Sequence, residues 1–86
     1  MIIDFHKRFD KQNSKLNKTI RDQFKDRLVL FIEDRTDPVL NNHGLKGKYT
    51  GYRSINVTGD IRAIFIEHAK DHIEFVYIGS HSQLYG

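Results

Sequence analysis

The pattern of hydrophobic and polar positions predicts one strand and two helices in the first 36 residues. Residues 2–5 are apolar and β-prone apart from one aspartate, which favours a short strand. Residues 6–15 are highly charged and carry few apolar positions, as in a short amphipathic helix. From Leu16 to Ile32, apolar side chains recur every three or four residues, which is the period of a helix with one buried face.

The ends of the second helix follow from the residues that flank it. Ser14 and Asn17 both have side chains suited to cap a helix N-terminus. Pro38 disfavours helical geometry at the preceding residue, so the helix should end near residues 34–36. The stretch 37–50 contains a proline, asparagines and glycines, and it therefore predicts a loop.

Three strands are predicted in the remainder of the chain, at residues 52–57, 61–67 and 73–80, separated by short polar turns. The middle strand is apolar on both faces except for Arg62, as expected of a central strand. With the N-terminal strand, this order predicts an α+β fold. We expect an antiparallel sheet of about four strands, with two N-terminal helices packed on one face, as a single domain over residues 1–86.

Composition narrows the class of protein. The chain has no cysteine, which excludes a disulfide framework and thiolate metal ligands. Its apolar runs are far shorter than the roughly 18 residues that a membrane span requires, and its first residues lack the pattern of a secretory signal. We therefore expect a cytoplasmic protein without a membrane partner. The five histidines lack the spacing of a zinc site, so no metal or other cofactor is expected.

The charge balance is compatible with a polyanionic partner but does not establish one. Lysine and arginine number 14 against 11 acidic residues, which gives a formal net charge of +3. The two predicted helices carry a group of these cations: Lys7, Arg8, Lys11, Lys15, Lys18, Arg21 and Lys25. Phosphate contacts made by such a surface would be sensitive to salt.

Residues able to transfer protons concentrate at the ends of the predicted strands. His43, Asp60 and His81 are the candidate catalytic residues, because the ends of neighbouring strands can converge on one concavity. Two imidazoles and a carboxylate suit general acid–base cleavage of an RNA phosphodiester, in which a base removes the 2′-hydroxyl proton and an acid protonates the 5′-oxygen. The alternative readings are structural: His43 as a surface loop residue and Asp60 as a turn residue.

Basic side chains near these positions are candidates for phosphate binding. Lys46, Lys48 and Arg53 lie close to His43 in sequence. Arg62 is isolated in an apolar strand, where an unpaired buried cation would be costly, so it should face a pocket, a partner or a carboxylate.

Four short segments of the C-terminal half occur in a specific order. They are His43-Gly44-Leu45-Lys46-Gly47, Gly51-Tyr52-Arg53, Gly59-Asp60-Ile61-Arg62 and Ile78-Gly79-Ser80-His81-Ser82-Gln83-Leu84-Tyr85-Gly86. In this order they resemble the YafQ branch of the RelE-type bacterial toxins. The resemblance implies a ribosome-dependent, metal-independent mRNA endoribonuclease of a type II toxin-antitoxin system. It would act on mRNA in the ribosomal A site and be inhibited by a cognate antitoxin with an acidic segment.

The resemblance also implies roles for individual residues. His43 looks like the family's loop histidine, and Asp60 looks like its strand-start aspartate. His81 looks like the C-terminal histidine that such enzymes use as general acid. Arg62 is similar to the arginine that the RelE group places against phosphate. Tyr85 matches an aromatic position suited to stacking on an mRNA base.

Asn56 departs from the family, which usually has a histidine at this position. Asparagine can hydrogen-bond the substrate but cannot exchange a proton at neutral pH, so the role of base falls to His43 or Asp60. Two alternatives stay open. One is a ParE-like toxin that inhibits DNA gyrase without cleaving RNA, although such a protein needs no proton donors. The other is a catalytically degenerate toxin that retains antitoxin binding.

Overall fold

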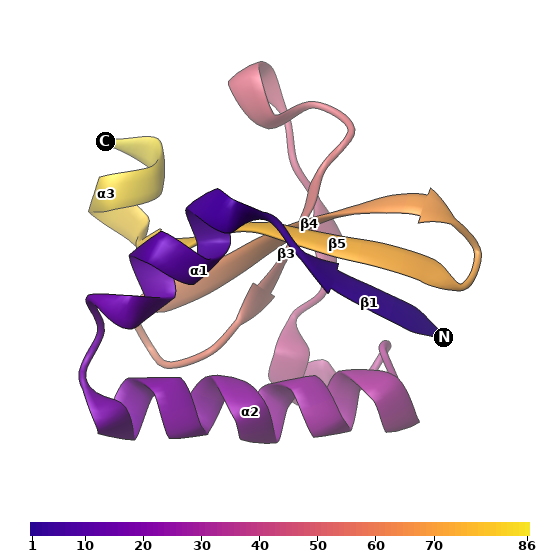
Figure 1. The fold of residues 1–86 in the computed structure, drawn as a ribbon. Coiled ribbons are helices and arrows are strands. Elements are labelled where there is room, and N and C mark those ends of the chain that lie inside the picture. Colours follow the sequence, from indigo (N-terminus) through magenta and orange to yellow (C-terminus); the bar gives the residue numbers. More distant parts are fainter.

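The computed structural model describes residues 1–86 as a five-stranded sheet with helices on both faces (Figure 1). The strands are β1 (Ile2–Phe5), β2 (His43–Gly44), β3 (Arg53–Asn56), β4 (Ile61–Ala69) and β5 (His72–Ser80). The α-helices are α1 (Lys7–Ser14), α2 (Lys18–Glu33) and α3 (His81–Tyr85), and two short 3₁₀ helices are η1 (Pro38–Leu40) and η2 (Gly47–Tyr49). None of the helices has the length and apolar character needed to cross a membrane.

The sheet has the order β1-β5-β4-β3-β2, and it confirms the α+β class. The observed sheet differs from the predicted one in two details. A fifth strand, β2, forms inside the predicted loop and pairs with β3. The sheet is also not purely antiparallel, because β1 runs parallel to β5. A parallel pair needs a long connection, and here the rest of the chain from α1 to β4 supplies it.

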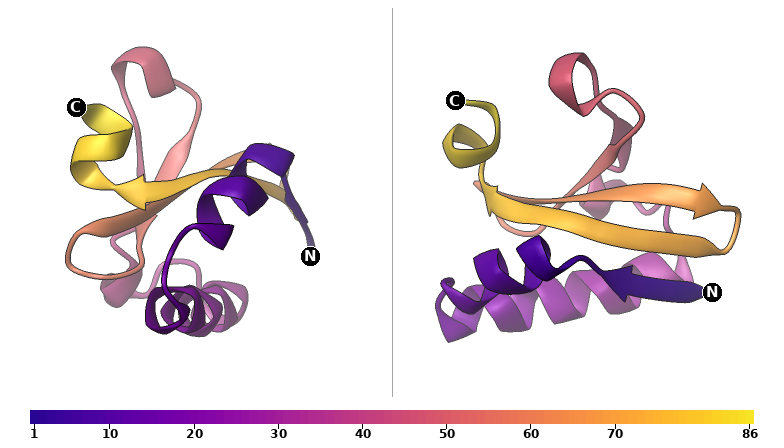
Figure 2. Two further views of the ribbon diagram at one scale, coloured as in Figure 1. Left: turned by 60° about the vertical axis from the view of Figure 1, so that its left-hand side comes forward. Right: turned by 45° about the horizontal axis from the view of Figure 1, so that its top comes forward.

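The two N-terminal helices begin at side-chain caps. His6 precedes α1 and accepts a hydrogen bond at Nδ1 from the backbone nitrogen of Arg8, at 3.0 Å. Asn17 precedes α2, and its Oδ1 accepts from the backbone nitrogen of Ile20 at 2.9 Å. Asn17, and not Ser14, is therefore the N-cap of the second helix. Figure 2 shows that α1 and α2 lie together along one side of the sheet, as predicted.

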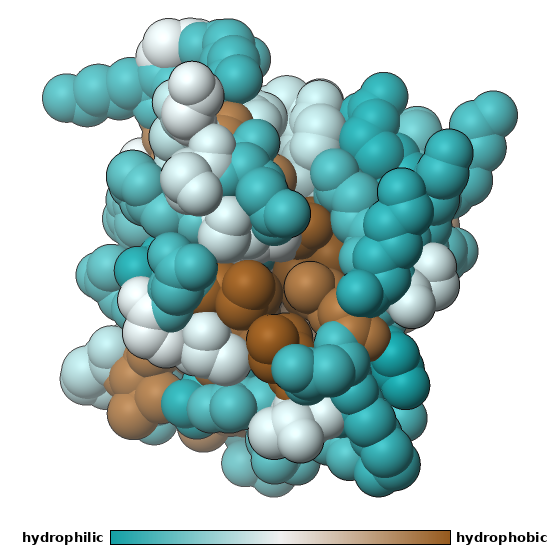
Figure 3. Space-filling view, turned by 90° about the vertical axis from the view of Figure 1, so that its left-hand side faces the viewer, coloured by the Kyte–Doolittle hydropathy of each residue, from teal (hydrophilic) through white to brown (hydrophobic).

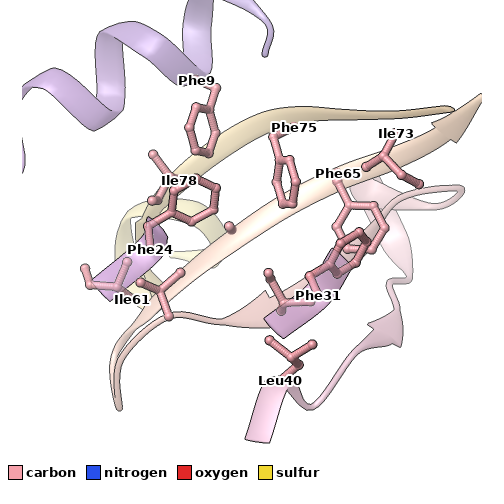
Figure 4. Packing of buried hydrophobic residues seen from close by; sticks show 12 residues of the cluster. Phe9, Phe24, Phe31, Leu40, Ile61, Phe65, Ile73, Phe75 and Ile78 are labelled. Carbon is pink, nitrogen blue, oxygen red and sulfur yellow. The ribbon is translucent and has the colours of Figure 1, made fainter. Parts of the chain in front are cut away.

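All six phenylalanines of the chain gather between the sheet and these two helices. The Phe75 ring of β5 lies at the centre of this cluster, with its centroid 5.3–5.9 Å from the other five rings. Figure 4 shows it with the four buried ones. The other five rings belong to Phe5, Phe9, Phe24, Phe31 and Phe65. Since β1, α1, α2 and β4 each supply at least one of these rings, the Phe75 side chain joins β5 to four other elements.

A bulge in β5 lets two parts of this strand face the same core. In the register, Phe75 pairs with Phe65 and Tyr77 pairs with Ile64, so Val76 has no partner on β4. The extra residue places both Phe75 and Ile78 on the side of the helices, although they are three positions apart.

The opposite face of the sheet carries a smaller core beneath η2 and α3. Tyr49, Ile64 and Leu84 are buried there. Helix α3 was not predicted, although Ser80 and Gln83 form a capping box, a signal that can be read from sequence. Figure 3 shows that, on the side of the molecule formed by α1 and α3, hydrophobic side chains reach the surface mainly in a central hollow.

We expect Phe75→Ala to lower the free energy of unfolding by about 3–5 kcal/mol, because it removes the ring that joins the elements around the larger core. The measurement is urea unfolding followed by circular dichroism. Val29→Ala is the control, because Val29 is 55% exposed on α2 and should change stability by less than about 0.5 kcal/mol. Equal effects of the two substitutions would contradict the central role of Phe75.

Candidate functional site

A cavity of about 370 Å³ opens on the sheet face opposite α1 and α2. Its lining residues are Asn41, His43, Leu45, Ser54, Arg62, His81 and Tyr85. Four of them, His43, Arg62, His81 and Tyr85, were predicted as site residues, and they come from β2, β4 and α3. The fold therefore brings together both candidate histidines and the isolated arginine from segments that are distant in sequence.

His43 is held by a backbone carbonyl. Its Nδ1 lies 2.8 Å from the carbonyl oxygen of Asn41. A carbonyl only accepts, so Nδ1 carries the hydrogen and donates it, and in the neutral ring Nε2 remains as the acceptor. Asn41 has a left-handed backbone conformation, with φ of 46°, which asparagine tolerates better than most residues. This local geometry leaves His43 with one nitrogen suited to take up a proton.

His81 is the first residue of α3, and the capping box fixes the start of this helix. The hydroxyl of Ser80 accepts from the backbone nitrogen of Gln83 at 3.1 Å, and Gln83 Oε1 accepts from the backbone nitrogen of Ser80 at 2.8 Å. His81 and Tyr85 are four residues apart on one helix face, and their rings are 4.8 Å apart. The helix thus presents an imidazole and an aromatic ring side by side to the cavity.

Arg62 faces the cavity without a carboxylate partner. Its guanidinium donates to the backbone carbonyls of Thr58, Gly59 and Ile61 at 3.0–3.2 Å. No ion pair of the structure includes it. The turn between β3 and β4 therefore orients a full positive charge, and the remaining donors of the guanidinium are available to an anion.

Asp60 does not line the cavity, although it adjoins it. Its side chain is exposed in the turn, and its backbone carbonyl accepts from the backbone nitrogen of His81 at 3.1 Å. Its contact with α3 is thus made by the main chain. The exposed residues Lys46 and Lys48 also lie outside the lining, and Lys48 Nζ is 5.2 Å from the ring of Tyr49.

Arg53 belongs to a different surface. In the register it stands opposite Phe65, whereas the next residue, Ser54, stands opposite Ile64, so Arg53 projects from the other face of the sheet. Its Nε donates to Asn42 Oδ1 at 2.9 Å and lies 4.0 Å from Glu67 Oε1. The structure therefore does not bring Arg53 into the cavity.

Two polar side chains of β3 lie on the cavity face without hydrogen-bond partners. Ser54 is fully buried, lines the cavity and is the register partner of His43. Asn56 is half-buried two positions further along and pairs with Arg62, and its Oδ1 has no partner. A buried polar atom without a hydrogen bond lowers the stability of the fold, so its presence calls for an explanation, and a functional site is one. Ser54 was not predicted as a site residue. It stands two positions before Asn56, and the two-residue period of a strand places both side chains on the same face.

Tyr49 holds α3 against the sheet. Its hydroxyl donates to the carbonyl of Leu84 at 2.8 Å, and its ring is edge-on to Tyr85 at 5.6 Å. Burial raises the pKa of Tyr49 above its ordinary value, and the nearby phenols of Tyr77 and Tyr85 add to this increase. The position of the helix that carries His81 therefore depends on a neutral phenol.

A family model described as the bacterial toxin of type II toxin-antitoxin system, YafQ, matches residues 1–86. Among solved structures, the chain is similar to YafQ from E. coli strain BL21(DE3), with a TM-score of 0.82 and 23% identity over 98% of this chain and 97% of that chain. It is also similar to a chain of the E. coli DinJ-YafQ toxin-antitoxin complex, with a TM-score of 0.79 and 24% identity over 98% and 96% of the two chains.

A more distant likeness is to the YoeB dimer from Staphylococcus aureus, with a TM-score of 0.74 and 16% identity over 94% of this chain and 97% of that chain. At these identities the solved structures support the fold. No curated protein sequence matches this chain at a significant level.

We expect Tyr49→Phe to lower the free energy of unfolding by about 0.5–1.5 kcal/mol at neutral pH, because it removes the hydrogen bond to Leu84. The folded pKa of Tyr49 is raised, so its contribution to stability is present below the unfolded value of about 10 and is lost as pH rises through the folded value. The stability of Tyr49→Phe should therefore fall less steeply above about pH 10. Urea unfolding across pH measures both effects, with Tyr52→Phe as the control for loss of a phenol. Parallel pH curves for wild type and Tyr49→Phe would contradict this account.

Proposed function

Because this chain belongs to the YafQ family of bacterial type II toxins, we propose that it is an mRNA endoribonuclease that depends on the ribosome and not on a metal ion. The observation that carries the proposal is the meeting of His43 and His81 in one cavity with the unpaired guanidinium of Arg62. Two groups that can exchange protons near neutral pH and one fixed cation are what cleavage of an RNA phosphodiester requires. Action on the ribosome would place the protein in the cytoplasm.

His43 is the proposed general base. Its Nε2 would accept the proton of the ribose 2′-hydroxyl while the carbonyl of Asn41 holds Nδ1–H. Between the two candidates that the sequence leaves open, the geometry favours His43, since Asp60 lies outside the cavity lining. Asn56 has no titratable group and would instead hydrogen-bond the substrate.

His81 is the proposed general acid. The 2′-oxygen would bond to phosphorus as the bond from phosphorus to the 5′-oxygen breaks, and His81 would give its proton to that 5′-oxygen. The products would be a 2′,3′-cyclic phosphate and a 5′-hydroxyl end. Arg62 would neutralise charge on the phosphate oxygens, and the Tyr85 ring beside His81 would stack on a base. Lys46 and Lys48 lie outside the cavity and would contact phosphates further along the RNA.

The same family supports an antitoxin as partner. The DinJ-YafQ structure is a toxin-antitoxin complex, and this chain shares its toxin fold. We propose that an acidic segment of a cognate antitoxin binds this chain, because the net charge of +3 favours such a partner. A gyrase inhibitor would need neither the paired imidazoles nor the carbonyl that orients one of them.

We expect His81→Ala to lower cleavage of mRNA on ribosomes with an open A site by about 10²–10⁴-fold, which is the usual contribution of one general acid. The assay compares purified wild type and variant, with EDTA present and with naked RNA as a second substrate. His68→Ala is the matched control, because His68 lies near the end of β4, pairs with Glu74 of β5 and does not line the cavity. Wild-type cleavage that survives EDTA and requires ribosomes would support the proposal, and no cleavage by wild type would favour a gyrase inhibitor or a degenerate toxin.

Asn56→His tests whether the departure from the family limits catalysis. The new imidazole would stand beside Arg62 on the cavity face and could share the role of base, so we expect at least a tenfold faster cleavage. Asn56→Gln controls for the larger side chain. A wild type without activity that gains it through Asn56→His would identify a degenerate toxin, whereas an unchanged rate would show that His43 suffices.

A further inference from the structure

All four tyrosines of the chain form one cluster that leads away from the cavity. Tyr85 packs on Tyr49 at 5.6 Å, and Tyr49 packs on Tyr77 at 5.3 Å. Tyr52 also touches the cluster, at 6.2 Å from Tyr77. The cluster begins at His81, whose ring is 4.8 Å from Tyr85. Tyr49 is buried and joins the half-buried rings of Tyr85 and Tyr77, so the cluster extends from the proposed general acid across the face of the sheet.

The far end of this cluster is cationic. The guanidinium carbon of Arg8 on α1 lies 4.9 Å from the ring centroid of Tyr77, in cation–π contact. Beyond it, His6, Lys7, Arg8 and Lys11 line a hollow of about 470 Å³ without any acidic or apolar residue. None of the three long cations takes part in an ion pair. Their charge is thus available to a partner.

The cations of α1 lie on a different side of the helix from its buried and acidic residues. Phe9 is buried in the phenylalanine core, and Asp10 and Asn13 line a separate groove that faces α2. Lys25 and Arg21 of α2 line that same groove. The cations that the sequence predicts as one helical surface are therefore dispersed. Lys15 lines a third groove, Lys18 pairs with Asp22, and only the hollow lined by Lys7, Arg8 and Lys11 adjoins the tyrosines.

We propose that the path from Tyr85 through Tyr77 to Arg8, Lys7 and Lys11 binds the single-stranded RNA that flanks the cleavage site. This proposal rests on the proposed function, because it extends the strand that enters the cavity. Half-buried tyrosine rings can stack on successive bases, and the cations can contact their phosphates without reading sequence. Continuity with the cavity is the reason for assigning the surface to the substrate strand and not to ribosomal RNA.

The test is the dependence of binding on the length of the oligonucleotide. Labelled single-stranded DNA is the probe, because it offers bases and phosphates but has no 2′-hydroxyl and so cannot be cleaved by the proposed reaction. Fluorescence anisotropy would compare an oligonucleotide of about three nucleotides, which fills the cavity alone, with one of about twelve, which also reaches α1. Wild type should bind the longer one at least tenfold more tightly.

Arg8→Gln and Tyr77→Leu should each remove about three- to tenfold of that gain and leave binding of the short oligonucleotide unchanged. Arg8→Gln should also reduce the slope of log affinity against log salt by about 0.7, as expected for one phosphate of a single strand. Lys25→Gln is the matched control, because it removes one exposed cation from the other groove. Arg8 is exposed, so its substitution keeps the test valid if Tyr77→Leu fails to fold.

Three results would overturn the proposal. They are equal losses for Arg8→Gln and Lys25→Gln, no gain with length in wild type, and an Arg8→Gln defect in ribosome binding that leaves oligonucleotide binding intact. The last result would assign the surface to ribosomal RNA. Failure of the proposed function is distinguishable, because wild type would then still bind the longer oligonucleotide more tightly than the short one but would not cleave mRNA on ribosomes.

Discussion

The contact of Phe75 with the five other phenylalanine rings is the interaction on which the rest of the structure depends. A chain of 86 residues has little apolar area to bury, so each large side chain must serve several elements. The Phe75 ring contacts rings from β1, α1, α2 and β4, and the phenylalanine core therefore holds the two N-terminal helices against one face of the sheet. The opposite face is then free to carry polar and charged groups, and the cavity lies there.

Aromatic residues divide between the two faces according to their chemistry. The phenylalanines lie between the sheet and the helices α1 and α2, where no polar atom needs a partner. The tyrosines lie on the opposite face, where η2 and α3 pack and hydroxyls can reach carbonyls or solvent. The central strand β4 alternates between them, since Ala63 and Phe65 face one core and Ile64 faces the other. Arg62 is on the tyrosine face, and this placement makes a charged residue tolerable in an otherwise apolar strand.

Much of the fold could be predicted from local patterns, because helical periodicity and strand alternation report burial directly. The direction of β1 and the existence of the two-residue strand β2 could not be predicted in this way, since both depend on partners that are distant in sequence. For the candidate site, residue chemistry pointed to His43, Arg62 and His81, and the family resemblance added Tyr85; the fold brings these four together. It could not show that Arg53 projects from the other face or that Ser54 lies at the cavity, because neighbouring positions on β3 differ only in which side they face.

The bulge at Val76 determines which side of the sheet each residue after it faces. Residues an odd number of positions apart face opposite sides of a regular strand, yet Phe75 and Ile78 share a side. If β5 were a regular strand in which Val76 also paired with β4, anchoring Phe75 in its core would turn the end of β5 over and place α3, with its imidazole, on the side of the helices. A single unpaired residue thus acts as a geometric offset between the half of the strand that stabilises the molecule and the half that serves the cavity.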